Sequence, residues 1–348
     1  MNDIVKQPPS KTGRYSIWFV IVVLSLLLSF NLTLRPDLAS RDGDFRWRKA
    51  LIGFYTAFRF QLGDRVFNQA IVGRDGWFFF TGEQSVDDYQ GVAVLRPGKL
   101  ARLQRNLDRL NSQLLEQGIH LLVVIAPNKS TIYPQYMPEG VAVTGQPSRL
   151  DQFLAYMQAN GKTPILDLRP ALLEASQTQQ VYFKTDTHWN AQGAFLAYQR
   201  IMQVLSVHDP ALAPQPLSAY REESVGMQMR DLPPLMGLRD LPEATEVLLP
   251  VQDARLEIVS TSLPDGRIIR TVTNTDRALP SLVVFGDSFY GSLAVFVEQH
   301  FSHTKSIPFT YEPGVWSLHW IEEEQPDYVI IEITERIVDL SLPMLLEN

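Results

Sequence analysis

The stretch "RPGKLARLQRNLDRLNSQLLEQGIHLLVVIAP", residues 96–127, decides the fold class. Its first part predicts an amphipathic helix that ends at Gly118, because five leucines recur at helical spacing on one stripe: Leu100, Leu103, Leu107, Leu110 and Leu114. The sequence then changes at once to "HLLVVIAP", a continuous apolar run of strand length. A strand without polar alternation is typical of a sheet that is buried on both faces.

The same combination of an apolar strand and a helical stretch recurs along the chain. "TPILDL" (163–168) precedes "RPALLEAS", "SLVVFGDS" (281–288) precedes "FYGSLAVFVEQHF", and "DYVIIEIT" (327–334) is a further apolar strand. Four such strands alternating with helices predict an α/β fold, with a parallel sheet covered by helices on both faces. 

Two other stretches predict antiparallel pairs. "VGRDGWFFFTG" (72–82) has a Gly-Arg-Asp-Gly turn that leads into an aromatic strand. Residues 247–275 alternate around a Pro-Asp-Gly turn, which predicts a β-hairpin insertion on the same domain.

Composition excludes several classes of function. The chain has 348 residues, 45% of them hydrophobic, which is enough for a packed core. A net charge of −7 argues against nucleic acid as a partner, because phosphate binding needs a concentrated basic face. Cysteine is absent, so thiol catalysis, disulfides and thiolate metal sites are excluded.

The N-terminal part predicts a membrane anchor. "YSIWFVIVVLSLLLSFNLTL" (15–34) carries no charge and as a helix could cross a bilayer core of roughly 30 Å. We expect an uncleaved signal anchor, with residues 1–14 in the cytoplasm, although a signal peptide cleaved near "DLAS" (37–40) is the alternative. Residues 35–69 would then form linker helices, and residues 70–348 a domain in the periplasm, attached to the inner membrane.

Polar side chains follow the predicted strands, where a parallel sheet binds its ligands. They are Asn128, Lys129, Asp167, Asp287, Ser288, Glu332, Glu335 and Arg336. Ser288 is the sharpest candidate, because it follows a buried strand and a glycine at the start of a helix. Its hydroxyl would be presented at the sheet edge, and its N–H would face a tetrahedral oxyanion. The alternative is a helix N-cap, for which Ser and Asp are preferred.

A serine nucleophile needs a base, and the base needs an acceptor that orients it. "FKTDTHWNAQGAF" (183–195) offers both, since Asp186 and His188 are two residues apart in a non-helical segment. His188 alone would more simply be a structural histidine. A metal site formed by Asp186 and His188 is a further alternative, but it lacks a third ligand. Together with Ser288, the pair predicts a Ser-His-Asp triad and no metal.

Four motifs also resemble a known family. "GRDGWFFFTG", "VVIAPNKSTIYPQYMP", "KTDTHWNAQGAFLAY" and "VVFGDSFYGSL", in this order behind a single anchor, resemble the alginate O-acetyltransferase family of bacterial exopolysaccharide systems, the AlgJ and AlgX type, over about residues 70–340. The resemblance implies an SGNH-hydrolase-like (flavodoxin-like) parallel sheet with permuted motif order. "MRDLPPL" (229–235) departs from the family pattern, because Arg230 stands where the family has glycine.

The resemblance implies a function. Ser288 would be the nucleophile that carries the acetyl group, His188 its general base and Asp186 the residue that orients the base. The acceptor would be a hydroxyl of alginate or a similar exopolysaccharide. No cofactor would be bound; the acetyl donor would come from a membrane-bound O-acyltransferase partner, with other exopolysaccharide secretion subunits as further partners.

Five more residues are predicted to contribute to the oxyanion site or to bind substrate: Asn128, Lys129, Tyr133, Trp189 and Tyr290. Trp189 either forms a wall that faces the sugar or anchors its loop in the core. Two other functions stay open: an esterase with the same triad, in which water takes the acetyl group, and a non-catalytic subunit of a polysaccharide-secretion complex.

Overall fold

The computed structural model describes residues 21–26, 48–238, 241–251, 256–311 and 314–346. The predicted anchor, 15–34, lies outside these residues except for 21–26, which are helical. Within the described part of the chain, no helix is both long and apolar enough to span a membrane. The chain divides into two compact units, residues 1–64 and 65–348. Helix α2 (Arg48–Gln61) belongs to the first unit, and the strands and helices below belong to the second.

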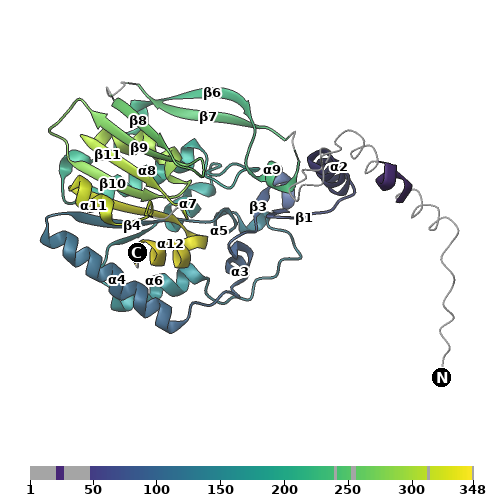
Figure 1. Ribbon diagram of the computed structural model, residues 1–348, viewed down its shortest axis with the longest axis horizontal. Helices are drawn as coiled ribbons and strands as arrows, with labels where there is room; N and C mark the ends of the chain where they lie inside the picture. The colour runs from purple at the N-terminus through teal and green to yellow at the C-terminus, as the bar shows by residue number, and fades with distance from the viewer. Residues whose placement is uncertain (1–20, 27–47, 239–240, 252–255, 312–313, 347–348) are drawn as a thin grey trace, which may run out of the picture. The chain divides into compact units, whose positions relative to one another are not determined.

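A seven-stranded sheet forms the centre of the second unit (Figure 1). Its order is β5 (Ile165–Asp167), β4 (His120–Ala126), β12 (Tyr328–Thr334), β10 (Ser281–Gly286), β11 (His303–Pro308), β9 (Ile268–Asn274) and β8 (Leu256–Ser262). The strands from β5 to β11 are parallel, whereas β9 and β8 pair antiparallel. The four apolar strands predicted from the sequence are β4, β5, β10 and β12, so the prediction of a mostly parallel sheet is confirmed.

Each face of the sheet has its own apolar core. Along β4, Leu122 and Val124 point into one core, while Leu121 and Val123 point into the other. Helices α7 (Arg169–Ser176), α8 (Ala191–Leu205) and α10 (Tyr290–Val297) contribute to the first core. Helices α4 (Pro97–Glu116), α6 (Arg149–Asn160), α11 (His319–Glu324) and α12 (Val338–Leu346) contribute to the second. Burial on both faces explains why the central strands β4, β10 and β12 are mostly apolar and do not alternate with polar residues.

The helix predicted from the leucine stripe is α4, and all five leucines are buried. The predicted turn at 72–82 is also present: β1 (Val66–Phe67), β2 (Ala70–Val72) and β3 (Phe78–Phe80) form a small antiparallel sheet. Asp75 and Gly76 turn the chain between β2 and β3 with φ values of 52° and 78°. The shorter helices of this unit are α3 (Ser85–Gln90), α5 (Lys129–Ile132) and α9 (Leu232–Met236).

The prediction for residues 247–275 was partly wrong. Strands β8 and β9 do form a hairpin, but β9 also pairs with β11 and extends the main sheet. Residues 247–250 instead belong to β7 (Glu243–Pro250), which pairs with β6 (Tyr220–Gln228) in a separate two-stranded sheet. Strand β11 was not predicted because its buried positions include Thr304 and Ser306, which interrupt any apolar run.

Candidate active site

Residues 286–290, here called the nucleophile turn, connect β10 to α10. Ser288 is exposed at the carboxyl end of the sheet. Asp287 fixes the turn: its Oδ1 accepts the N–H of Phe289 at 2.9 Å, and its Oδ2 accepts the N–H of Thr334 at 2.7 Å as well as the Thr334 hydroxyl. The N-cap reading of Ser288 is wrong, because α10 begins at Tyr290 with Phe289 as its N-cap.

Gly286 permits this tight turn. A Cβ at this position would lie 2.7 Å from the Cβ of Tyr290, a distance that no side chain can accept without displacement. Beneath the turn, the buried Glu332 accepts the N–H of Asp287 at 3.2 Å. Burial raises the pKa of Glu332 well above its usual range, which favours the neutral form of this carboxyl.

Residues 183–190, here called the base loop, bring the predicted acid and base to Ser288. The Nε2 atom of His188 lies 2.7 Å from the Oγ of Ser288, and its Nδ1 lies 2.6 Å from the Oδ1 of Asp186. Although burial opposes it, the hydrogen bonds and charge of His188 lower the pKa of Asp186 to about 2. An ionised carboxylate can only accept, so Nδ1 donates to Asp186 and Nε2 is free to accept the proton of the Ser288 hydroxyl.

Lys129 stabilises the base loop through hydrogen bonds to its backbone. Its Nζ donates to three backbone oxygens: those of Phe183 at 3.1 Å, Lys184 at 2.9 Å and Asp186 at 2.6 Å. The residue is only 4% exposed, and burial lowers its pKa to about 7 against the opposing charges of Asp231 and Asp186. The predicted substrate-binding role of Lys129 does not fit these contacts, because its donors are used within the protein.

Glu243, on β7, also forms hydrogen bonds to the base loop. Its carboxylate accepts the N–H of Lys184 at 2.8 Å, and the N–H and hydroxyl of Thr185 at 2.9 and 2.8 Å. Arg230 lies over the ring of Phe183, 3.5 Å from its centroid. No sequence pattern pointed to Glu243, since it lies before the predicted strand region 247–275 and its partners are far away along the chain.

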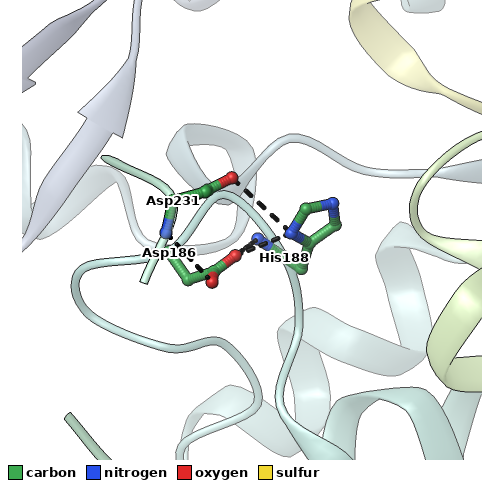
Figure 2. A group of neighbouring side chains, drawn as sticks. All are labelled: Asp186, His188 and Asp231. Atoms are coloured by element: carbon green, nitrogen blue, oxygen red, sulfur yellow. Dashed lines mark hydrogen bonds and ion pairs between the residues drawn. The ribbon is translucent and has the colours of Figure 1, made fainter. Parts of the chain in front are cut away.

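Asp231 was also missed, although it lies in the "MRDLPPL" stretch. Its Oδ1 accepts the N–H of Thr187 at 2.7 Å, and its Oδ2 lies 3.7 Å from the Nδ1 of His188 (Figure 2). Asp186, His188 and Asp231 therefore bring three metal-ligating atoms within 4.8 Å of one another. A metal ion on Nδ1 would displace the hydrogen bond that Nδ1 donates to Asp186 and leave the ring proton on Nε2, so a metal site and a triad exclude each other.

Three predicted substrate contacts face the interior instead. Trp189 is 1% exposed, and its Nε1 donates to the Oγ of Ser292 at 2.6 Å, so it anchors the base loop in the core. Tyr133 is buried, and its hydroxyl accepts the N–H of Val181 at 2.9 Å. Tyr290 is 5% exposed, and its hydroxyl is buried. Aromatic side chains at these positions fill space that the neighbouring turns enclose, which removes them from contact with a substrate.

Asn128 remains a candidate oxyanion donor. Its backbone N–H donates to Glu335 at 2.8 Å, and its Oδ1 accepts from Arg336 at 3.3 Å. Its Nδ2 is buried and has no hydrogen-bond partner among the described residues. Asn128 shares a small hollow with Thr187, the residue before His188.

A serine at the end of a parallel strand, facing a histidine and an aspartate on one loop, gives this α/β unit the arrangement of an SGNH-hydrolase-like protein. The chain belongs to the family described as "SGNH hydrolase-like domain, acetyltransferase AlgX", whose model matches residues 70–300. The resemblance found from the four sequence motifs is thereby confirmed.

Similar proteins agree with this family. The probable alginate O-acetylase AlgJ of Pseudomonas putida is 27% identical over 166 residues, which are 47% of this chain and 41% of that protein. AlgJ of Pseudomonas aeruginosa is 28% identical over 165 residues, 47% of this chain and 40% of that protein. Each match therefore spans less than half of the relative's length.

Solved structures show the same fold. PatB1 of Bacillus cereus, solved with a sulfonyl adduct, matches with a TM-score of 0.59 at 15% identity, over 76% of this chain and 96% of that chain. A DHHW family protein from Eubacterium siraeum matches with a TM-score of 0.56 at 14% identity, over 80% and 96% of the two chains.

Proposed function

We propose that this protein is an O-acetyltransferase that moves an acetyl group to a polysaccharide hydroxyl through an acetyl-Ser288 intermediate. One observation carries the proposal: the side chains of Asp186, His188 and Ser288 form a continuous hydrogen-bonded line, with contacts of 2.6 and 2.7 Å. The exposed Ser288 hydroxyl ends this line and is accessible to an acyl donor.

The reaction has two halves. First, the Oγ of Ser288 attacks the acetyl carbonyl of the donor while Nε2 of His188 takes the hydroxyl proton; the tetrahedral intermediate then collapses, and that proton goes to the leaving group. Next, an acceptor hydroxyl gives its proton to Nε2 and attacks the acetyl-serine, and the released Ser288 takes the proton back. Asp186 keeps its charge throughout and stabilises the imidazolium. The backbone N–H of Ser288 and the side-chain Nδ2 of Asn128 would stabilise the oxyanion.

A hollow of about 330 Å³ beside the base loop suits an acceptor that is rich in hydroxyl groups. Phe183 and Asn190, at the two ends of the base loop, line this hollow. The other polar lining side chains are amides and carboxylates: Gln179, Gln180, Gln192, Glu222, Glu243 and Glu246. Planar amide and carboxylate groups provide the paired donors and acceptors that bind sugar hydroxyls.

The sequence and the family also support a cellular setting for this reaction. The apolar segment 15–34 supports an inner-membrane anchor with the second unit in the periplasm, where acetyl-CoA is not available. The donor would therefore be delivered by a membrane-bound O-acyltransferase partner. The polymer would be alginate or a similar exopolysaccharide.

Transfer and hydrolysis are separated by following the acetyl group. The full-length protein is given a chromogenic acetyl ester, with and without an oligosaccharide acceptor, and acetylated oligosaccharide and free acetate are both measured. A transferase forms acetylated oligosaccharide at the expense of acetate. If acetate alone is released at every acceptor concentration, the protein is an esterase.

Two further alternatives have direct tests. A non-catalytic secretion subunit would not be labelled at Ser288 by a serine-directed sulfonyl probe, whereas the proposed enzyme is labelled and the His188→Ala variant is not. A metal enzyme built on Asp186, His188 and Asp231 would lose activity to a chelator and recover it with added Zn²⁺. The triad predicts the same rate before and after chelation.

A further inference from the structure

Asp231 is a polar residue near the triad that has no part in the proposed reaction. It precedes α9, and it both accepts a hydrogen bond from the base loop and donates one to it. Its Oδ1 accepts the N–H of Thr187 at 2.7 Å, while its own N–H donates to the Oδ2 of Asp186 at 3.4 Å. Next to it, the N–H of Leu232 donates to the backbone oxygen of Thr185 at 3.3 Å. The segment 185–187 is thus fixed to residues 231–232 just before His188.

The carboxylate of Asp231 also faces the imidazole. Figure 2 shows both aspartates on the Nδ1 side of the His188 ring. The Oδ1 of Asp186 is hydrogen-bonded to Nδ1 at 2.6 Å, and the Oδ2 of Asp231 lies 3.7 Å from the same atom. The longer distance is not a hydrogen bond, but at this distance the carboxylate attracts an imidazolium at His188 electrostatically.

Two carboxylates at one nitrogen repel each other, and the surrounding groups offset this repulsion. Burial and then the charge of Asp186 raise the pKa of Asp231, while His188 lowers it. Two cations lie close by. The ammonium of Lys129 and the guanidinium of Arg230 each interact with Asp186, Asp231 and Glu243. These charged and titratable groups come from α5, the base loop, the start of α9 and β7.

We propose that Asp231 is a positioning residue that acts through His188: it fixes the segment before the histidine, and its charge stabilises the imidazolium that forms during acyl transfer. This inference rests on the proposed function, since it assigns a role within the same reaction. The proton passes between Ser288, His188 and the leaving group as described, and Asp231 does not receive it.

Asp231→Asn separates the two parts of this role. The asparagine keeps an oxygen that accepts the N–H of Thr187 but has no charge, whereas Asp231→Ala removes both. Hydrolysis of a chromogenic acetyl ester by the full-length protein is measured from about pH 5 to about pH 8. We expect Asp231→Asn to lower kcat about tenfold with KM nearly unchanged, and Asp231→Ala to lower it further. The acid limb of the rate profile should move to lower pH in both variants, because the protonated ring has lost a stabilising charge.

Controls keep the outcomes distinct. Glu257→Gln removes one negative charge from the exposed face of β8 and should leave kcat and the pH profile unchanged. If Asp231→Asn has the wild-type kcat and pH profile, or loses kcat with an unmoved profile and a lowered Tm, the inference is wrong. Ser288→Ala in the same assay tests the proposed function separately: an active Ser288→Ala enzyme overturns that function, whereas an inactive one beside an unaffected Asp231→Asn enzyme overturns only the role of Asp231.

Discussion

The nucleophile turn and the base loop meet at one contact, the 2.7 Å distance between Ser288 Oγ and His188 Nε2, yet the fold fixes them in different ways. The nucleophile turn leaves the middle of the sheet, where β10 lies between β12 and β11. Two carboxyl side chains hold it at this edge: Asp287 binds backbone groups of Phe289 and Thr334, and Glu332 of β12 accepts the N–H of Asp287. The strand end therefore determines where Ser288 lies.

The base loop has no such strand. An isolated bridge between Tyr182 and Trp189 joins its two ends, and its backbone is bound by side chains from three other places, Lys129, Glu243 and Asp231. The serine is thus positioned by sheet geometry, whereas the histidine is positioned by polar side chains far away in sequence. Substitutions far from the triad should therefore displace His188 more readily than Ser288.

The largest effect should come from removing the contact between the two regions. Ser288→Ala or His188→Ala should lower kcat/KM for acetyl transfer by about 10⁴-fold or more, because triad members act as a unit. The measurement is acetyl transfer to an oligosaccharide by the purified protein. Ser260→Ala, on the exposed part of β8, is the matched control and should keep full activity.

Lys129→Met tests whether the base loop depends on its remote support. Methionine matches lysine in length but cannot donate to the oxygens of Phe183, Lys184 and Asp186. Displacement of His188 by even about 1 Å should cost about a hundredfold in kcat. Labelling of Ser288 by a strongly reactive sulfonyl probe should fall in parallel, since it needs the base. Lys162→Met, at an exposed position, serves as the control; an unaltered kcat in Lys129→Met would contradict the comparison.

Glu335 should make the support of the base loop sensitive to pH. Its carboxylate accepts from the N–H of Asn128 and the hydroxyl of Thr131, at the start of the helix that carries Lys129. Burial raises the pKa of Glu335 from 4.5 to about 7. Between these values the unfolded chain has lost this proton while the folded protein keeps it, so the contribution to stability is complete below pH 4.5 and is lost as pH rises through 7.

Glu335→Gln keeps an acceptor oxygen and does not titrate. Wild-type protein should lose up to about 3 kcal/mol of unfolding free energy from this group across that range, and the variant should lose much less. Denaturant unfolding at about pH 5 and about pH 8 measures the difference. Equal pH dependence in wild type and variant would show that Glu335 is ionised in the folded protein.

The smallest effect should come from Tyr133→Phe. It removes the hydroxyl that accepts the N–H of Val181, just before the base loop, and should lower the free energy of unfolding by about 1 kcal/mol and kcat by a few-fold. Tyr136→Phe is the matched control, because no hydrogen bond of its hydroxyl is seen among the described residues. Equal losses in both variants would mean that the Val181 contact has no special importance.

The difference between the nucleophile turn and the base loop also explains which site residues could be predicted from the sequence. Ser288 could be predicted because its strand, glycine and helix are continuous in sequence, and Asp186 with His188 because they are two residues apart. Glu243 and Asp231 could not, since the contacts to Thr185 and Thr187 span 58 and 44 residues with no local pattern. Two roles were open for Trp189, a wall that faces the sugar or an anchor in the core, and its burial fits the anchor that a loop without a strand needs. That need also accounts for the burial of Lys129.

Detection of an acetyl group on Ser288 is the most direct test of the proposed acetyl-serine intermediate. Full-length protein is incubated with an acetyl donor in the absence of acceptor, quenched in acid and digested, and the peptide that contains Ser288 is measured by mass spectrometry. We predict that this peptide gains one acetyl group, loses it when an acceptor oligosaccharide is added before the quench, and never gains it in His188→Ala. Continued acetyl transfer to the oligosaccharide with no acetyl group on Ser288 at any time would contradict the account.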